Sequence, residues 1–431
     1  MNSYAHMLSQ IQRPAAMERF NRLYGRRSGE MARQLSRYTQ LVKAHEDLFH
    51  ADDKPLYMIS APGRTEIIGN HTDHNNGRVL AAAVNLDCLA CVSKRDDMLV
   101  RVQSAGYPGI ELSLDDLDKR SEEEGTSAAL VRGVAKGMAD RGYQLGGFDA
   151  AVTSDVLGGS GLSSSAAYEV MVCAIIDALY NGFCVDAITR AQIAQYAENV
   201  YFGKPSGLMD QMASSVGGLV TIDFKNDPQV TPLFYDFQEA GYSLIVVNTG
   251  GSHDNLTEEY ASIRTEMQGV AEMMGYKVLR QARQDEIKKN VNMLRQKLGE
   301  RAVLRAMHFF DENRRVKNMV QAIQNKDLDA MFENIIASGE SSWMLLQNLY
   351  PAGKKEQPLA LALAVASCRL KGKGAWRVHG GGFAGTTLNI VPNGQVDEFV
   401  KAMEWIFGDH ACLVLDVRPE GAAVVISPED K

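Results

Sequence analysis

The chain has 431 residues, of which 45% are hydrophobic and 23% are charged. These proportions are typical of a globular protein and exclude a disordered or collagen-like one. At about 150 residues per domain, the length predicts two to three domains. The 45 basic and 53 acidic side chains give a formal charge of −8. Because the sequence also contains no tract rich in Lys or Arg, nucleic acid is excluded as an expected partner.

Location and redox state follow from the apolar segments and the cysteines. No stretch reaches the roughly 18 uncharged apolar residues of a membrane span, and residues 1–13 lack the layout of a signal peptide. The sequence therefore predicts a cytoplasmic protein with no membrane partner. Cys88 and Cys91 form a single CxxC inside an apolar run, with no second pair nearby. This pattern favours a buried strand over a zinc or redox site.

The first part of the chain predicts helices and then strands. Residues 1–50 carry arginines among spaced apolar side chains, which predicts a helical N-terminal extension. A strand over Leu56 to Ser60 is expected to stop at Ala61-Pro62-Gly63, and a polar loop follows. Further strands are predicted over residues 79–92, 99–103 and 148–152.

The second part alternates helical and strand-like patterns. A helix is predicted from Ser163 to Asn181, and residues 256–347 have a helical period with breaks near Gly275 and Asn325. Strands are expected at 376–379, 386–391 and 412–417, around a helix over 396–407. This mixture predicts an α/β (α+β) fold with two lobes packed together. The expected divisions are an extension over 1–50, an N-terminal lobe over 51–217 and a C-terminal lobe over 218–431, with the boundary near Gly217-Gly218.

A loop rich in Gly and Ser, residues 157–167, leads into the first long helix. Glycines allow close approach of an anion, the free N–H groups of a helix start favour negative charge, and the hydroxyls add donors or a metal ligand. The loop lacks the Lys of a P-loop, and no acidic residue stands where a Rossmann site requires one. A second glycine-rich turn, residues 380–385, precedes a strand and is expected to form a tight hairpin or a wall of the same site.

Two further segments contain polar residues suited to a sugar site. Residues 63–77 combine carboxylate, amide, imidazole and guanidinium groups, which together suit sugar hydroxyls that both donate and accept hydrogen bonds. Residues 198–211 bring Asp210 next to a Gly/Pro turn and a short helical run. The Asp210 side chain is expected either to project into a cleft or to cap that helix.

In their chain order, these segments resemble the galactokinase family, within the superfamily that includes homoserine, mevalonate and phosphomevalonate kinases. The resemblance covers about residues 56–427. Gly63 to Gly77 match the family pattern GRxNLIGEHTDYNGG, and Gly159 to Glu169 match GSGLSSSAAxE. Gly207 to Gln211 match GxMDQ, and Gly380 to Gly385 match the late glycine turn GxGFGG. Each motif alone has little weight, but four in the correct order are specific.

The resemblance implies a two-lobed small-molecule kinase fold with mixed sheets and a largely helical segment in the second lobe. It also implies ATP-dependent phosphorylation of the anomeric hydroxyl of galactose, with Asp210 acting as general base or orienting the hydroxyl. Arg64 would stabilise the developing charge. The implied substrate-binding residues are Asn70, His71, Asp73, Gly207 and Tyr260.

The resemblance also assigns the ATP and magnesium sites. The implied ATP-binding residues are Gly158, Gly159, Ser160, Gly161, Leu162, Ser163, Ser164 and Ser165. Mg²⁺ would take oxygen ligands from Ser165 and Glu198, with water and phosphate oxygens completing its shell. The expected assembly state is a monomer or a weak homo-oligomer.

The match departs from the family pattern at Asn70 and His74, which replace the family's Glu and Tyr. Loss of the Glu would tolerate a carboxylate on the sugar, so a kinase for a uronic acid such as galacturonate is an alternative to galactose. A non-catalytic galactokinase-like sugar sensor is a second alternative, although Arg64, the serines, Glu198 and Asp210 are all present. A nicotinamide dehydrogenase is disfavoured because the ribose-binding acid is missing.

Overall fold

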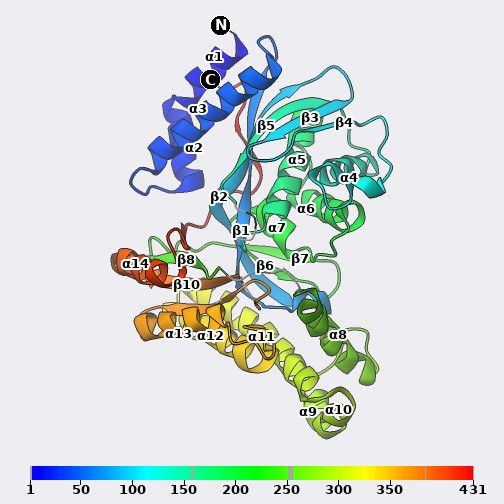
Figure 1. The fold of residues 1–431 in the computed structure, drawn as a ribbon, viewed down its shortest axis with the longest axis vertical. Helices are drawn as coiled ribbons and strands as arrows, with labels where there is room; N and C mark the ends of the chain where they lie inside the picture. Colours follow the sequence, from blue (N-terminus) through cyan, green and yellow to red (C-terminus); the bar gives the residue numbers. More distant parts are fainter. Residues whose placement is uncertain (1, 157, 159–160, 251–255, 384, 431) are drawn as a thin grey trace.

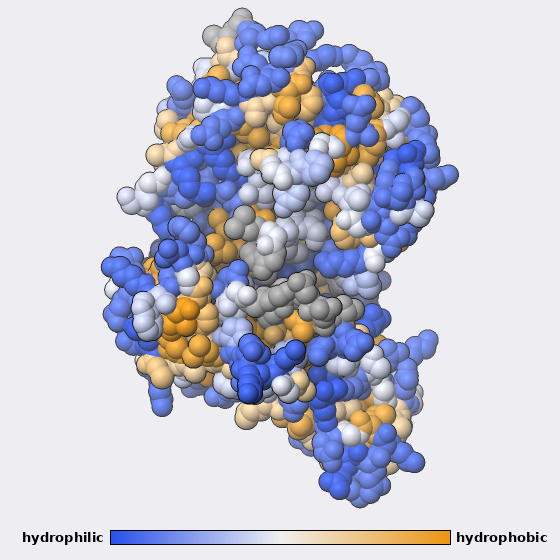
Figure 2. Space-filling model, in the orientation of Figure 1, coloured by the Kyte–Doolittle hydropathy of each residue, from blue (hydrophilic) through white to orange (hydrophobic). Residues whose placement is uncertain are grey.

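The computed structural model describes residues 2–156, 158, 161–250, 256–383 and 385–430. The molecule is elongated with a narrower waist, and its two β-sheets are centred in different halves, although the first sheet extends into both (Figure 1, Figure 2). Within those ranges no helix is long and apolar enough to cross a bilayer.

The first sheet has eight strands built around two unusually long ones. The strands are β1 (Leu56–Ile68), β2 (Arg78–Lys94), β3 (Leu99–Ser104), β4 (Ile110–Ser113), β5 (Phe148–Ser154), β6 (Leu219–Asp223), β7 (Gln229–Leu233) and β12 (Ala423–Ile426). They run in the order β12-β1-β2-β5-β3-β4, with β6 on β2 and β7 on β6. One edge of β2 pairs with β1, and the other pairs with β6 and then β5. The β1–β2 ribbon therefore runs through both halves.

The predicted stop at Pro62-Gly63 is wrong, because β1 continues to Ile68. A β-bulge between Pro62 and Arg64 accommodates the two residues, and the pairing with β2 resumes at Arg64↔Ala83. The Arg64 N–H donates to the Leu162 carbonyl at 3.0 Å instead of to the ladder. The bulge thus fastens β1 to the Gly/Ser loop.

The second sheet has the order β11-β8-β10-β9 and is antiparallel. Its strands are β8 (Tyr242–Asn248), β9 (Ala375–His379), β10 (Thr386–Pro392) and β11 (Cys412–Leu415). Helices α13 (Pro358–Leu370) and α14 (Val396–Phe407) pack on one face. The other face packs against α11 (Glu300–Asn325) and α12 (Leu328–Ser341), in a core cluster that also contains residues of the first sheet. The two lobes are therefore packed together, as predicted.

The predicted helix over residues 163–181 and the predicted helical region over 256–347 are both confirmed, whereas the helices over 127–139 and 187–196 were not predicted. Helices α4 (Ser127–Ala139), α5 (Ser164–Tyr180) and α6 (Ala187–Tyr196) pack against the first sheet in the main core cluster, and α7 (Met209–Val216) packs on β2 and β6 in a separate cluster. The helical region continues with α8 (Thr257–Met273), α9 (Gln284–Lys289) and α10 (Val291–Leu298). The predicted breaks near Gly275 and Asn325 coincide with the ends of α8 and α11.

The expected lobe boundary near Gly217-Gly218 does not separate the two sheets. Strands β6 and β7 follow it and still belong to the first sheet, and the second sheet begins only with β8. The C-terminal strand β12 also returns to pair with β1. Glycines at 217 and 218 mark a sharp turn, because both have positive φ and the Gly218 N–H donates to the Arg418 carbonyl at 2.8 Å.

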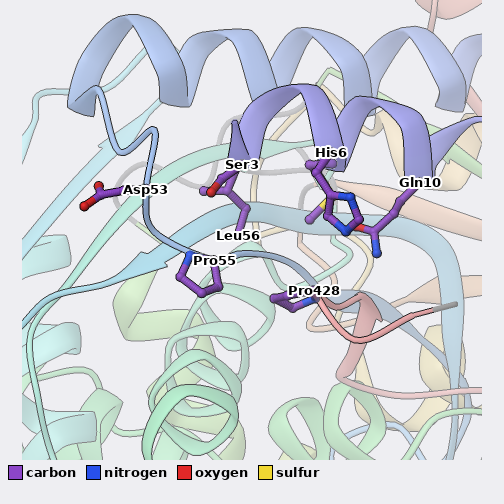
Figure 3. Close-up of a pocket in the computed structure, with 8 residues that line it drawn as sticks. Ser3, His6, Gln10, Asp53, Pro55, Leu56 and Pro428 are labelled. Atoms are coloured by element: carbon purple, nitrogen blue, oxygen red, sulfur yellow. The ribbon is translucent and has the colours of Figure 1, made fainter. Parts of the chain in front are cut away.

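Residues 1–50 form α1 (Ser3–Ile11), α2 (Pro14–Tyr24) and α3 (Glu30–Phe49), which cover the outer face of the first sheet (Figure 1). Cys91 lies in the core under these helices, whereas Cys88 lies in the core on the opposite face. Both thiols are buried and free, which agrees with the predicted strand. A cavity of about 210 Å³ lies between α1, Pro55 and Pro428 (Figure 3).

A buried ion cluster connects the N-terminal helices to the sheet. Asp87 of β2 accepts hydrogen bonds from Tyr24 of α2 at 2.6 Å and from Arg37 of α3 at 2.6 Å. Arg418 approaches the same carboxylate at 3.0 Å, and Ser60 of β1 donates to it. Burial raises the pKa of Asp87, but the two guanidinium groups outweigh it and hold the pKa below its usual value.

Candidate active site

A cavity of about 260 Å³ opens where β1, α5, α7 and the β9–β10 turn meet. Its lining is mainly polar and comprises Arg64, Gly161, Ser163, Ser164, Ser165, Lys204, Asp210, His379, Gly380, Gly381, Gly382, Gly385 and Thr386. All four sequence motifs thus meet in one cavity. The late glycine turn forms one wall, as the sequence suggested.

Arg64 and Asp210 form a bidentate ion pair in this cavity, although 146 residues separate them. The Arg64 Nε and Nη2 atoms each lie 2.7 Å from a different carboxylate oxygen of Asp210. Ser163 Oγ donates to Asp210 Oδ2 at 2.6 Å. Asp210 lies inside the first turn of α7 and does not cap it, so the alternative of a capping role is not what the structure shows.

Burial and partners have opposite effects on the pKa of Asp210. Burial alone raises it, but the charge and hydrogen bonds of Arg64, together with the Ser163 hydroxyl, lower it below its usual value. Asp210 is therefore an anion at neutral pH. Its oxygens line the cavity and can accept or orient a hydroxyl proton there.

The Gly/Ser loop contributes its last residues to the cavity. Ser163 has φ of 62° at the start of α5, and Ser164 and Ser165 follow in the first turn. Gly161 has φ of +74°, and a Cβ there would lie 2.6 Å from the Thr386 hydroxyl, so only glycine fits. The free N–H groups of a helix start favour an anion such as phosphate, and the three serines at this start line the cavity.

Not every predicted ATP residue lines the cavity. The Leu162 side chain is buried in the main core instead, where it anchors the loop. Gly158 is not among the lining residues. Gly159 and Ser160 lie outside the described residues.

Ser165 and Glu198, the predicted magnesium ligands, are in contact. Ser165 Oγ donates to Glu198 Oε1 at 2.9 Å. Glu198 is 2% exposed and lies in a π-helical turn, η3 (Ala197–Phe202), a feature frequent at functional sites. No group of three or more acidic, His or Cys ligands occurs among the described residues. One hydroxyl and one carboxylate nevertheless fit Mg²⁺, which commonly keeps water and phosphate oxygens as its other ligands.

A second carboxylate lies behind Glu198. Glu169 of α5 accepts a hydrogen bond from Gln211 Nε2 at 3.3 Å, and its Oε1 is buried without a hydrogen-bond partner. Burial, and then the charge of Glu198, raise the pKa of Glu169 well above its usual value. Gln211 bridges the two acids, because its Nε2 also donates to Glu198 at 2.7 Å. Sequence reasoning included Glu169 in a motif but gave it no role.

The predicted sugar residues border the cavity through the glycine turn. His71 lies 2.9 Å from the Gly381 carbonyl, and the Tyr260 hydroxyl donates to the Gly382 carbonyl at 2.7 Å. Burial lowers the pKa of His71 to about 4, so its imidazole is neutral and its Nε2–H is the donor. These two side chains support the wall formed by the turn.

Asp73 and Gly207 lie against each other. Asp73 begins the short 3₁₀ helix η1 (Asp73–Asn75). Any Cβ on Gly207 would overlap the Asp73 carboxylate, so the glycine of the GxMDQ box is what allows the sugar loop to approach. Burial raises the pKa of Asp73, and the neighbouring His74 outweighs this effect and lowers it.

Protein groups hold the Asn70 side chain on all sides. Asn70 is 1% exposed. Its Nδ2 donates to Glu66 Oε1 at 3.1 Å and to the Gly380 carbonyl at 2.6 Å. Its Oδ1 accepts from Ser342 at 3.2 Å and from Asn348 at 2.9 Å. An amide has two donor and two acceptor positions, and protein groups fill all of them. These contacts give Asn70 a structural role, and its assignment to substrate binding stays a prediction.

Glu66 explains why position 70 differs from the family pattern. The pattern GRxNLIGE has Asn where this chain has Glu66, and Glu where it has Asn70. The two residue types are exchanged, and their side chains remain hydrogen-bonded. The buried Arg377 donates to Glu66 Oε1 at 2.6 Å and balances its charge. Relative to the family pattern, the carboxylate therefore lies four residues earlier in this chain, at Glu66, and is not lost.

Lys204 and His379 are cavity residues that sequence reasoning did not assign to the site. Lys204 lies just before the GxMDQ box, outside the residues that the motif specifies, and lines the cavity. His379 ends β9 and lies 3.0 Å from the Thr65 hydroxyl and 2.9 Å from the Thr386 hydroxyl. Burial, followed by the charges of Arg64 and Arg377, lowers the pKa of His379 well below its usual value. The neutral His379 imidazole therefore connects β1 to the second sheet by hydrogen bonds to two threonine hydroxyls.

Comparisons with known proteins agree with this geometry. Residues 43–94 match the galactokinase galactose-binding signature, and residues 129–218 match the N-terminal domain of GHMP kinases. A galactokinase of Streptomyces coelicolor is 32% identical over 88% of this chain and 95% of its own length. A galactokinase of Glaesserella parasuis is 34% identical over 80% of this chain and 87% of its own.

A solved structure has the same fold. The Lactococcus lactis galactokinase complexed with galactose superimposes with a TM-score of 0.77 at 24% identity, covering 90% of this chain and 99% of the other. A mevalonate kinase structure gives 0.60 at 14% identity, covering 83% of this chain and 98% of the other. With an identity above 30% to relatives matched over nearly their whole length, and with the family's motifs meeting in one cavity, the chain is a kinase and belongs to the galactokinase family.

Proposed function

We propose that this protein transfers the γ-phosphoryl group of ATP to the anomeric hydroxyl of galactose, giving galactose 1-phosphate and ADP. The observation that supports this most is the Arg64–Asp210 ion pair beside the Ser-rich start of α5. Asp210 accepts or orients the hydroxyl proton, and Arg64 stabilises charge on the transferring group. Positioning and electrostatics of this kind carry most of phosphoryl-transfer catalysis.

The same cavity accounts for the nucleotide and its metal. The N–H groups at the start of α5 suit the phosphates of ATP, and Ser165 with Glu198 would hold Mg²⁺. When bound, the ion neutralises charge on the phosphate oxygens. Because ATP is the proposed donor, we place the reaction in the cytoplasm.

Galactose is favoured over a uronic acid by the position of Glu66. A site for galacturonate would require the loss of the family's carboxylate at position 70. The Glu66 carboxylate lies 3.1 Å from the Asn70 amide, so negative charge is retained beside the sugar loop. Arg377 is committed to Glu66 and provides no free cation for a substrate carboxylate. Galactose is also the sugar named in the complex of the Lactococcus lactis protein.

The test is ADP release from ATP and Mg²⁺ on galactose, galacturonate, glucose, arabinose and no sugar. We expect a clear preference for galactose, and product analysis should locate the phosphate on C1. A preference for galacturonate would show that the Glu66 argument is wrong. Absence of turnover on every sugar, with galactose still binding in calorimetry, would instead support the non-catalytic sensor.

A further inference from the structure

Lys204 makes a contact that is incompatible with metal binding at Glu198. Its Nζ lies 2.9 Å from Glu198 Oε1, the same oxygen that accepts the Ser165 hydroxyl at 2.9 Å. The other oxygen, Oε2, accepts Ser206 Oγ at 2.6 Å and Gln211 Nε2 at 2.7 Å. All the acceptor positions of this carboxylate are thus occupied, and a cation can bind only if one donor leaves.

Lys204 is the donor that can leave. Gln211 is fully buried, and Ser165 and Ser206 have short side chains with little reach. The Lys204 side chain is 58% exposed, on a flexible four-carbon stem. Its backbone N–H donates to the Glu198 carbonyl at 3.1 Å, so the main chain is anchored while the ammonium is free to move.

An ammonium that leaves Glu198 has phosphate-binding groups within the same cavity. Lys204 lines the same 260 Å³ space as Ser163, Ser164 and Ser165, where the start of α5 suits phosphate. A lysine there acts on phosphate as a point charge. The groups that would face the mobile ammonium are therefore a carboxylate in one state and phosphate oxygens in the other.

We propose that Lys204 is a further residue of the phosphoryl-transfer site, whose ammonium occupies the cation position on Glu198 in the absence of metal and pairs with a phosphate oxygen once metal and nucleotide bind. This inference rests on the proposed function, because it takes ATP and Mg²⁺ as ligands. Lys204 thus has two negatively charged partners in succession, first the Glu198 carboxylate and then a phosphate oxygen. Glu198 is thereby neutralised in the free protein without a metal.

The experiment measures binding, so that it does not depend on turnover. The variant is Lys204→Met, and the probes are Mn²⁺ alone, followed by electron paramagnetic resonance, and a non-hydrolysable ATP analogue with Mg²⁺, followed by calorimetry. Removal of the competing ammonium should tighten Mn²⁺ binding about threefold. Removal of the phosphate partner should weaken binding of the metal–nucleotide on the order of tenfold.

The decisive result is this reversal of sign between the two states. If both affinities fall or neither changes, Lys204 is a structural residue and the proposal is wrong. Tighter Mn²⁺ binding with unchanged nucleotide binding would also overturn it, because Lys204 would then be a counter-charge only. Should the wild-type protein bind the metal–nucleotide but phosphorylate no sugar, the proposed function fails while this test remains readable.

Two further variants control for charge and folding. Lys119→Met removes a neighbouring lysine that pairs with Glu124 at 3.4 Å and does not line the cavity, and it should change neither affinity. Lys204→Arg keeps the positive charge, so it should hold Mn²⁺ affinity near the wild-type value and recover part of the nucleotide affinity. Circular dichroism on each variant establishes that the fold is retained.

Discussion

Replacing Asn70 by Asp should destabilise the protein strongly, even though the two side chains have almost the same shape. The substitution removes both Nδ2 donors, one to the Glu66 carboxylate at 3.1 Å and one to the Gly380 carbonyl at 2.6 Å. It also places a second carboxylate beside Glu66 in a site that is 1% exposed. Losing a charge-assisted and a neutral hydrogen bond, and leaving a buried acceptor unpaired, amounts to about 4 kcal/mol of unfolding free energy.

The measurement is urea unfolding of the wild type, Asn70→Asp, Glu66→Gln and the double variant. Glu66→Gln alone leaves the buried Arg377 without its counter-charge, which should cost about 3–5 kcal/mol. In the double variant the carboxylate and amide are exchanged, as in the family pattern, so we expect a loss at least about 2 kcal/mol smaller than the sum of the single losses.

The pH dependence gives an independent check. In Asn70→Asp, repulsion from Glu66 raises the pKa of one carboxyl in the folded state. A group with a raised pKa in the folded state contributes stability at low pH that is lost as the pH rises. The penalty of this variant should therefore be smaller at acidic than at neutral pH. A loss under about 1 kcal/mol at neutral pH, or simple additivity in the double variant, would refute the reasoning.

Three further predictions concern the cavity and the sheet. Asp210→Asn should lower kcat by at least about a hundredfold with a smaller change in KM. Because Arg64 holds the pKa of Asp210 below its usual value, the acid limb of wild-type kcat/KM should lie below about pH 4, and a limb near pH 6 would contradict the assignment. Asp87→Asn leaves the buried Arg418 without its counter-charge and should cost about 3–5 kcal/mol in urea unfolding. A cost under about 1 kcal/mol would show that the Asp87 cluster contributes little.

Motif order was sufficient to predict that Arg64 and Asp210 share a site, because each motif identifies its own loop and the family resemblance joins them. Periodicity located α5 and the breaks at the ends of α8 and α11. The sequence pattern wrongly predicted a strand end at Pro62-Gly63, where a β-bulge lets the strand continue. Local turn propensity carries no information about the partner strand β2, whose pairing holds these two residues in the sheet.

The role of Asn70 required tertiary information. Its four partners come from segments as far away as Asn348 and Gly380, and nothing in the local sequence indicates that they converge on one amide. Lys204 likewise has no signal of its own, because its significance depends on the buried Glu198 that it contacts. The boundary at Gly217 was misleading because a glycine turn marks a change of chain direction, and a change of sheet need not coincide with it.

The Asp87 cluster also has a mechanical consequence for the cavity. In the ladder Asp87 lies opposite Pro62, at the residue where the bulge that positions Arg64 begins. Tyr24 and Arg37, from helices on the far side of the sheet, hold that point of the ribbon from behind. The N-terminal extension thus acts as a buttress for the guanidinium of Arg64. A substitution in these helices that shifts the ribbon would misalign the Arg64 guanidinium. Such a variant should lower kcat more than it raises KM.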